Sequence, residues 1–381
     1  MPKKKTDIGR ASLLKHKQFG GKLEVVSKVP LETHADFSMY YTPGVGAVAT
    51  HLGKHPKDAR IYSIKKNTVA VVSDGTAVLG LGNIGPYGAL PVMEGKAAIF
   101  KSMANVDAFP IVLDTHEPDE VIETIVRIAP AFGGINLEDI SAPNCFYIEE
   151  ELKRRLNIPV MHDDQHGTAI VVLAALTNAL KVVKKKKEDT SITIIGSGAA
   201  GTAVALLLHN AGFSDIVVVD RTGAITRARK SLAPHKKKLM RLSSKRTRTM
   251  DAARAAEAID VLIGVSGPGG ITERMVASMN KDGIVFALAN PTPEIMPDIA
   301  HRAGARIVAT GRSDFPNQVN NALVFPGIFR GALDKGVSQI TDEMKIKAAY
   351  VLARLVKKPT VNNILPWMTD KRATKAVARA V

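Results

Sequence analysis

Apolar residues along the chain alternate between short β-branched runs and longer segments with helical spacing. Runs typical of buried strands lie in the first half at 68–73, 108–113, 134–136 and 158–161. Similar runs lie in the second half at 191–195, 216–219, 261–265, 284–288 and 306–309. Helical spacing is found between many of them, as at 117–128, 145–156 and 168–183. This alternation predicts an α/β fold with parallel sheets.

One glycine-rich turn has the context of a dinucleotide-binding motif. The run Gly196-Ser197-Gly198-Ala199-Ala200-Gly201 follows a β-branched strand and precedes an Ala- and Leu-rich helical segment. In this context the first glycine permits a tight turn, the second lets a pyrophosphate approach, and the third lets the helix pack closely on the strand. The sequence therefore predicts a Rossmann-type domain that binds a dinucleotide.

The next predicted strand ends at Asp220, where Rossmann domains place the group that binds the adenosine ribose. An acidic residue at this place favours NAD. Arg221 follows directly and can face a 2′-phosphate, so the choice between NAD and NADP stays open.

An earlier glycine pattern, formed by Gly80, Gly82 and Gly85, has a poorer context. Pro86, Gly88 and Pro91 follow it where a phosphate-binding helix ought to run, and none of them favours a helix interior. We interpret this stretch as a glycine-rich loop in another role, with helical spacing only from 97 to 103.

Adjacent carboxylates follow two of the predicted strands. Asp163 and Asp164 come after the run 158–161, and we expect them in an acidic loop before a helix that starts at Thr168. A single Asp there is commonly no more than a favourable residue at a helix N-terminus, but a pair favours a cation or proton-transfer site. Glu138 and Asp139 follow another strand. Oxygen ligands such as Glu138, Asp139 and Asp164 suit Mg²⁺ or Mn²⁺ rather than zinc.

Length and composition bound the class of protein. The 381 residues suffice for two domains, and Cys145 is the only cysteine, which excludes an intramolecular disulfide. We see no apolar run of signal-peptide or membrane-spanning length, so we expect a cytoplasmic protein without membrane insertion.

The net charge of +16 is unevenly distributed. The stretch between Asp220 and Asp251 has no acidic residue, and basic side chains accumulate at 227–248. Such a surplus can attract nucleic acid or steer acidic ligands. The stretch lacks the interleaved aromatic residues that single-strand binders use, so we favour a solvated connection over a nucleic-acid-binding surface.

A dinucleotide beside a hard divalent cation indicates the oxidation of a hydroxy acid. The metal chelates hydroxyl and carboxylate, a base takes the hydroxyl proton, and hydride passes to the nicotinamide. If the product is a β-keto acid, the same metal stabilises the enolate that remains after CO₂ leaves. Other polar candidates are each more commonly structural when taken alone, and they are Tyr41, Lys96, Asn290, Asn320 and Asn321.

Seven motifs occur in order between about residues 38 and 330. They are Tyr41-Thr-Pro-Gly-Val, Asp74-Gly-Thr-Ala-Val-Leu-Gly-Leu-Gly-Asn-Ile-Gly, Glu94-Gly-Lys, Leu137-Glu-Asp, His162-Asp-Asp-Gln-His-Gly-Thr, Ala289-Asn-Pro-Thr and Asn320-Asn-Ala-Leu-Val-Phe-Pro-Gly. Together they resemble the malic enzyme family, and the length suits its short prokaryotic branch. The resemblance implies oxidative decarboxylation of (S)-malate to pyruvate and CO₂ with NAD⁺ or NADP⁺, by a homodimer.

The resemblance also implies a domain organisation. We expect a smaller α/β substrate and metal domain at residues 1–160 and an NAD(P)-binding domain at 161–381. The Rossmann core would lie at about 190–315, with C-terminal helices that pack back on the first domain.

By the same resemblance, Lys96 is the general base and Tyr41 the acid that protonates enolpyruvate. Glu138, Asp139 and Asp164 hold the metal, while Asp163 tunes Lys96. Asn290 and Asn320 contact substrate or the nicotinamide ribose, and Asn321 competes with Asn320 for that role.

The chain departs from the family pattern at Ala77, where longer relatives carry an arginine that binds a substrate carboxylate. The residue that replaces this arginine is left unassigned. A malolactic-type reaction, which makes lactate without net oxidation, is the alternative activity for the same site.

Overall fold

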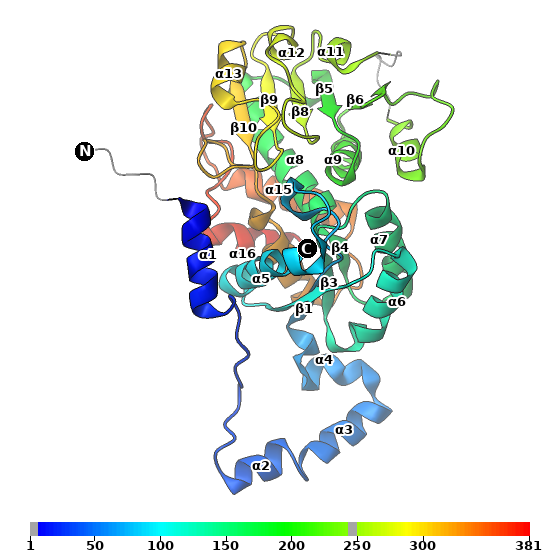
Figure 1. Cartoon of the computed structure of the whole chain (residues 1–381), viewed down its shortest axis with the longest axis vertical. Helices are drawn as coiled ribbons and strands as arrows, with labels where there is room; N and C mark the ends of the chain where they lie inside the picture. Colours follow the sequence, from blue (N-terminus) through cyan, green and yellow to red (C-terminus); the bar gives the residue numbers. More distant parts are fainter. Residues whose placement is uncertain (1–6, 243–249) are drawn as a thin grey trace, which may run out of the picture.

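Two parallel sheets form the main body of the computed structural model, which describes residues 7–242 and 250–381. The first sheet lies in the lower part of the view in Figure 1 and has the order β2-β1-β3-β4. Its strands are β1 (Thr68–Ser73), β2 (Asp107–Val112), β3 (Gly134–Leu137) and β4 (Val160–His162). All of their pairings are parallel, as the alternation of apolar runs and helices predicts.

The second sheet lies above the first in Figure 1 and has the order β10-β9-β8-β5-β6-β7. Its parallel strands are β5 (Ser191–Ile195), β6 (Asp215–Asp220), β8 (Val261–Gly264), β9 (Ile284–Ala287) and β10 (Ile307–Thr310). The short β7 (Gly223–Ala224) pairs antiparallel with β6 at the edge. The predicted α/β class with a Rossmann-type half is confirmed.

Alternate residues of β1 face two different cores. Val69 and Val71 pack in the same cluster as Phe100 of α5 (Gly85–Ala104), while Ala70 and Val72 pack toward the other face of the sheet. That second face is covered by α6 (Pro118–Ile128) and α7 (Asn144–Arg155). A strand buried on both faces reads as a continuous apolar run, which is why β1 was predicted with its observed bounds.

Helix α8 (Asp163–Val183) connects the two sheets through the centre of the molecule (Figure 1). It packs against α9 (Ala199–Asn210) and α15 (Asp342–Arg354). Within the described residues α8 is also the one helix whose length and apolar composition would allow it to cross a membrane. Because 67% of its apolar window is buried inside the protein, α8 is a core helix.

The prediction that helical structure begins only at Ala97 was wrong, because α5 runs through the proline-containing stretch. Pro86 lies in its first turn, where the missing N–H is not needed. Pro91 lies inside the helix and costs it one backbone hydrogen bond. The buried Met93 and Phe100 favour the helical conformation, since each gains about 1.5 to 3 kcal/mol by leaving water.

The C-terminal helices return to the first sheet. Helix α14 (Phe325–Lys335) contacts α5, and α16 (Lys371–Ala380) contacts both α5 and α14. The remaining short helices of the second half lie around its sheet, and they are α10 (Pro234–Leu239), α11 (Ala252–Ala255), α12 (Glu273–Ala277) and α13 (Pro297–Arg302).

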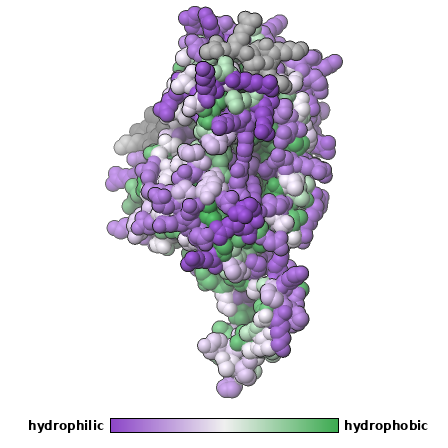
Figure 2. Space-filling model, turned by 90° about the vertical axis from the view of Figure 1, so that its right-hand side faces the viewer, coloured by the Kyte–Doolittle hydropathy of each residue, from purple (hydrophilic) through white to green (hydrophobic). Residues whose placement is uncertain are grey.

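The N-terminal segment contrasts with the body. After α1 (Ile8–Phe19), the chain extends away to α2 (His34–Tyr40) and α3 (Val45–Lys54), and α4 (Ala59–Tyr62) leads back to β1 (Figure 1). We call residues 34–54 the projecting arm. None of its residues is buried, although Phe37, Met39 and Val45 are apolar. Figure 2 shows hydrophobic surface in this projection and where it joins the body.

Candidate active site

A cleft of about 660 Å³ lies between the two halves of the chain. The first half contributes Lys96, Glu138, Asp139 and Asp164 to its lining, as well as Ala77. The second half contributes amides at the ends of strands and in loops, and these are Asn290, Asn320 and Asn321. The structure thus brings together most residues that the sequence singles out. The first glycine-rich stretch also lines this cleft, through Leu79 and Gly80.

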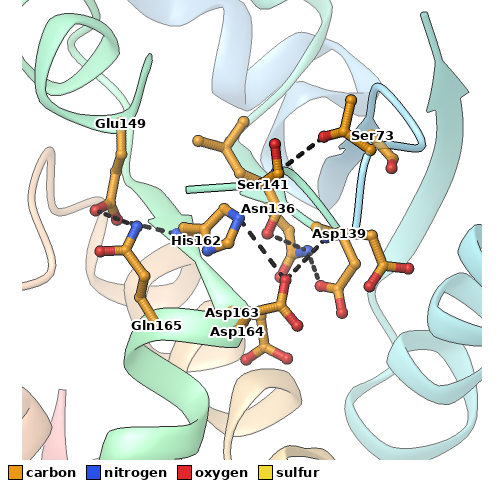
Figure 3. Close-up of polar contacts among 12 residues, drawn as sticks. Ser73, Asn136, Asp139, Ser141, Glu149, His162, Asp163, Asp164 and Gln165 are labelled. Atoms are coloured by element: carbon orange, nitrogen blue, oxygen red, sulfur yellow. Dashed lines mark hydrogen bonds and ion pairs between the residues drawn. The ribbon is translucent and has the colours of Figure 1, made fainter. Parts of the chain in front are cut away.

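Three carboxylates form a cluster that fits a divalent cation. Glu138 and Asp139 directly follow β3, and Asp164 lies in the first turn of α8, so that one oxygen of each lies within 4.8 Å of the others. The Asp139 backbone N–H donates to Asp164 Oδ2 at 2.8 Å (Figure 3). Asn136 Nδ2 donates to Glu138 Oε2 at 2.9 Å. Among the described residues, the buried Asp139 Oδ2 has no partner. An unpaired buried carboxylate oxygen is costly, and Mg²⁺ or Mn²⁺ would satisfy it.

The pKa values of Glu138 and Asp139 also indicate that the cluster can hold a cation. Burial raises the pKa of Glu138 well above its ordinary value, against the opposing effect of the Lys96 ammonium. Burial and the nearby Asp164 carboxylate raise the pKa of Asp139 from 3.8 to about 8. Asp139 therefore favours protonation unless a cation offsets its charge, whereas Glu138 already contacts the Lys96 ammonium.

Lys96 projects from α5 into this cluster and is only 7% exposed. Its Nζ donates to Glu138 Oε1 at 2.6 Å, forms an ion pair with Asp163, and lies 4.1 Å from the centroid of the Phe325 ring. Burial lowers the pKa of Lys96, but the carboxylates of Asp163 and Glu138 outweigh it and hold the pKa above its usual range. The side chain is therefore an ammonium in this arrangement.

The two adjacent aspartates point to different partners. Asp163 is fully buried and contacts Lys96, while Asn321 Nδ2 donates to Asp163 Oδ2 at 2.5 Å. A Cβ at position 167 would lie 2.0 Å from Asp163 Oδ1, so Gly167 is needed where Asp163 folds back along the helix. Asp164 instead accepts from the backbone of Asp139.

The predicted acidic loop was wrong, because α8 begins at Asp163 directly after β4 ends at His162. Both aspartates lie in the first helical turn, where unpaired backbone N–H groups and the helix dipole favour negative charge. The helix-terminal interpretation thus holds for both residues, while only Asp164 also belongs to the candidate cation site.

Asn320 and Asn321 differ in their contacts. Asn320 Oδ1 accepts from the backbone N–H of Ala322 at 2.8 Å and caps the short helix η6 (Asn321–Leu323). The Asn321 amide holds Asp163, and both residues line the cleft together with Asn290.

A second cavity, of about 1480 Å³, lies at the turn between β5 and α9. Gly196, Ser197 and Gly198 line it, together with Asp220 and Arg221. Ala200 of the same turn lines the cleft that holds Lys96. The two cavities therefore meet at the glycine-rich turn. A Cβ at position 201 would lie 2.0 Å from the Gly196 carbonyl oxygen, so Gly201 permits the close packing of α9 on β5.

Asp220 is paired with two cations from the basic stretch. Arg229 Nη1 donates to its Oδ1 at 2.8 Å, and Lys236 Nζ donates to its Oδ2 at 2.7 Å. Burial opposes ionisation of Asp220, but these donors hold its pKa well below the usual range. The interpretation of this stretch as a solvated connection was wrong for Arg229 and Lys236, which line the second cavity. Lys245, Arg246 and Arg248 lie outside the described residues.

Glu149 supports the site, although the charge-rich sequence around it suggests a side chain that faces solvent. It is 4% exposed and accepts from the His162 backbone N–H at 2.9 Å and from His166 Nε2 at 2.9 Å, with Lys153 as its ion-pair partner. It therefore ties α7 to the start of α8 (Figure 3). The helical spacing of Cys145, Ile148 and Leu152 places position 149 on the same face, which was the available signal.

Tyr41 is the candidate that the structure does not bring to the cleft within one chain. It follows α2 on the projecting arm, and 67% of its surface is exposed. It is absent from the lining of the cleft, as is its neighbour Tyr40.

Comparison with known proteins covers both halves of the chain. The family model described as "Malic enzyme, N-terminal domain" matches residues 20–153, and the one described as "Malic enzyme, NAD binding domain" matches residues 165–381. An NAD-dependent malic enzyme from Geobacillus stearothermophilus is 52% identical over 95% of this chain and 76% of its own length. A bifunctional malic/malolactic enzyme from Bacillus subtilis is 51% identical over 96% of this chain and 90% of its own. The crystal structure of an NAD-dependent malic enzyme from Thermotoga maritima superposes with a TM-score of 0.94 at 45% identity, covering 97% of this chain and 98% of that one.

Proposed function

Because the chain belongs to the malic enzyme family, we propose that it oxidises (S)-malate and releases CO₂ from the product to give pyruvate, with reduction of NAD⁺ or NADP⁺. The observation that carries this proposal is the cluster of Glu138, Asp139 and Asp164 around the buried Lys96, at the cleft next to the dinucleotide-binding turn. Mg²⁺ or Mn²⁺ at these carboxylates would polarise the hydroxyl and carboxylate oxygens of the substrate.

We assign Lys96 as the base that accepts the proton of the malate hydroxyl. Its position between Glu138 and Asp163 supports this role, because the pair fixes the ammonium at the edge of the carboxylate cluster. The neutral amine is needed to accept a proton, and it forms more readily once the charge of Glu138 and its neighbours is offset. A bound NAD⁺ or NADP⁺ would supply the acceptor for the hydride from C2 of malate.

Asn290, Asn320 and Asn321 are assigned to the substrate and the nicotinamide ribose, since all three line the cleft. Asn321 holds Asp163 in place, and Asp163 in turn positions Lys96. CO₂ then leaves with cleavage of the C3–C4 bond, whose electron pair forms the enolate of pyruvate. A proton delivered to C3 completes the reaction, and we assign this proton to Tyr41.

This assignment requires a second copy of the chain, because Tyr41 lies on the projecting arm and outside the cleft of its own chain. We propose a homodimer in which the arm of one copy brings Tyr41 to the cleft of the other. The apolar side chains on the arm support this arrangement, because Phe37, Met39 and Val48 are all exposed in the single chain. Burying them against a partner would favour the dimer.

The test of the function is a paired assay with malate and Mn²⁺, in which NAD(P)H absorbance is followed while pyruvate and lactate are quantified. Stoichiometric NAD(P)H and pyruvate are expected. The malolactic alternative, favoured by the name of the Bacillus subtilis relative, predicts lactate without net reduced cofactor.

DNA added at low salt is expected to leave the rates unchanged, which separates this enzyme from the nucleic-acid-binding hypothesis. We place the enzyme in the cytoplasm.

A further inference from the structure

The proposed substrate carries two carboxylates, and the cleft is itself acidic. Glu138, Asp139 and Asp164 line it, and a single divalent cation offsets only part of their charge. Position 77 in the same lining is an alanine and contributes no charge. A dicarboxylate therefore needs a further cation from the protein to bind there.

Lys22 and Lys96 are the cations in the described lining of this cleft. Lys96 is occupied, since Glu138 and Asp163 both bind its ammonium. Lys22 is exposed and has no carboxylate within ion-pair distance among the described residues. Of these two cations, Lys22 is therefore the one available to bind an anionic ligand.

The position of Lys22 is fixed by its contact with α5. Its Nζ donates to the carbonyl oxygen of Pro91 at 2.7 Å, about one turn before Lys96 on the same helix. The preceding residue runs close to α5 as well, because a Cβ at Gly21 would lie 3.3 Å from Glu94 Oε1. The segment after α1 therefore holds the ammonium at the rim of the cleft.

We propose that Lys22 binds the carboxylate of malate that does not chelate the metal. This inference rests on the proposed function. A carbonyl oxygen leaves the charge of Lys22 uncompensated, so the ammonium gains by exchanging Pro91 for a carboxylate. Its flexible four-carbon stem permits this movement without a change of the backbone.

The test compares two ligands that differ only in the carboxylate in question. Malate and 2-hydroxybutanoate share the hydroxyl and one carboxylate, but 2-hydroxybutanoate has a methyl group in place of the other. Dissociation constants are measured by calorimetry on the Mn²⁺-loaded enzyme without nucleotide. We expect Lys22→Met to weaken malate binding by about 10- to 100-fold and to leave 2-hydroxybutanoate binding unchanged. Lys22→Arg should restore most of the preference for malate.

Lys28→Met is the matched control, because Lys28 follows in the same segment but pairs with Asp107 outside the cleft. It should bind both ligands as the unmodified chain does. Equal weakening of both ligands in Lys22→Met would mean that Lys22 only holds the segment in place, and unchanged malate binding would mean that it does not meet the substrate. Either result overturns the inference. Failure of the unmodified enzyme to turn over malate would instead contradict the proposed function.

Discussion

Lys96 and Asp163 form a buried ion pair that joins the two halves of the chain. Lys96 lies on α5 beside the first sheet, and Asp163 is the first residue of α8, which leads to the second. Their side chains are 8% and 0% exposed, so water screens the pair very little. Glu138 accepts a second hydrogen bond from the Lys96 ammonium, and the Asn321 amide donates to Asp163. Such a pair is stable only while all its members are present.

Lys96→Ala should therefore affect both catalysis and stability. We expect malate oxidation to be lost, because the proposed base is removed. The free energy of unfolding of the metal-free protein should fall by about 3 to 5 kcal/mol, since Glu138 and Asp163 are left buried without their cation. Malate-dependent NAD(P)H formation and denaturant unfolding measure the two effects.

Lys101→Ala is the control on the same helix. Lys101 pairs with Asp107 at 2.7 Å, but its side chain is 55% exposed, and exposed pairs contribute about 1 kcal/mol or less. Both readouts should stay close to those of the unmodified enzyme. Near-normal kinetics in Lys96→Ala would contradict the assignment of Lys96 as base.

The carboxylate cluster should make metal affinity depend on pH. The pKa of Asp139 is raised to about 8 in the folded chain, from 3.8, so the folded state keeps a proton that the unfolded state has lost. Stability from this group is complete below pH 4 and is lost as the pH rises toward 8. Mn²⁺ competes with the same proton, so its affinity should increase over that range.

This prediction is tested by Mn²⁺ titration and denaturant unfolding of the metal-free protein at several pH values. Asp139→Asn should flatten the fall in stability and weaken Mn²⁺ binding. Asp164→Asn should also weaken Mn²⁺ binding, since Asp164 belongs to the same cluster. Metal affinity that is independent of pH between 5 and 8 would argue against a carboxylate cluster with raised pKa values.

Much of the fold was predictable because its strands are buried on both faces. The run at 68–73 has four consecutive apolar residues between Thr68 and Ser73 and is buried throughout, so its strand was located without knowledge of its neighbours. The site followed from topology, because the carboxyl ends of parallel strands meet at one edge of a sheet. Glu138 and Asp164 come from adjacent strand ends, β3 and β4, and they meet in the cluster.

Features that depend on tertiary contacts were not predictable in the same way. Local propensity places a break at Pro91, yet the packing of Met93 and Phe100 keeps α5 continuous. The charge-rich sequence of α7 suggests a solvated helix, yet Glu149 turns inward toward His162. The pairing of Asp220 with Arg229 depends on how the basic stretch folds back along β6, which periodicity does not encode.

Cofactor choice can be tested at Arg229. Asp220 accepts from Arg229 and Lys236, so two cations lie beside the residue at which Rossmann domains bind the adenosine ribose. We expect the enzyme to accept NADP⁺, and Arg229→Ser to raise the KM for NADP⁺ about tenfold or more while changing that for NAD⁺ less. Binding of 2′,5′-ADP and of 5′-AMP provides a readout without turnover.

Lys237→Ser is the control for this substitution, since Lys237 is exposed and does not line the cavity. It should leave the ratio of the two KM values unchanged. An equal loss for both cofactors in Arg229→Ser would show that Arg229 holds Asp220 in place without contacting the phosphate.

Glu149 should act on the metal site through the backbone. Burial raises its pKa, but His166 and Lys153 outweigh burial and hold the pKa well below its usual range, so the side chain is a carboxylate. It binds the His162 N–H, one residue before α8 begins. Glu149→Gln should weaken Mn²⁺ binding about tenfold, as for other groups that orient ligands. Glu150→Gln should have no effect, because Glu150 is 61% exposed and pairs only at the surface; equal titrations for both variants would exclude the positioning role.

The proposed transfer of Tyr41 between chains can be tested by mixing two inactive variants. Tyr41→Phe removes the phenol to which we assign protonation of the enolate, and Lys96→Ala removes the proposed base, so each homodimer should be inactive. In a mixed dimer, the arm of the Lys96→Ala chain brings an intact Tyr41 to the cleft that retains Lys96. Random exchange of subunits should therefore restore about a quarter of the normal activity. If Tyr41 serves the cleft of its own chain, every site in the mixture lacks one group and no activity returns.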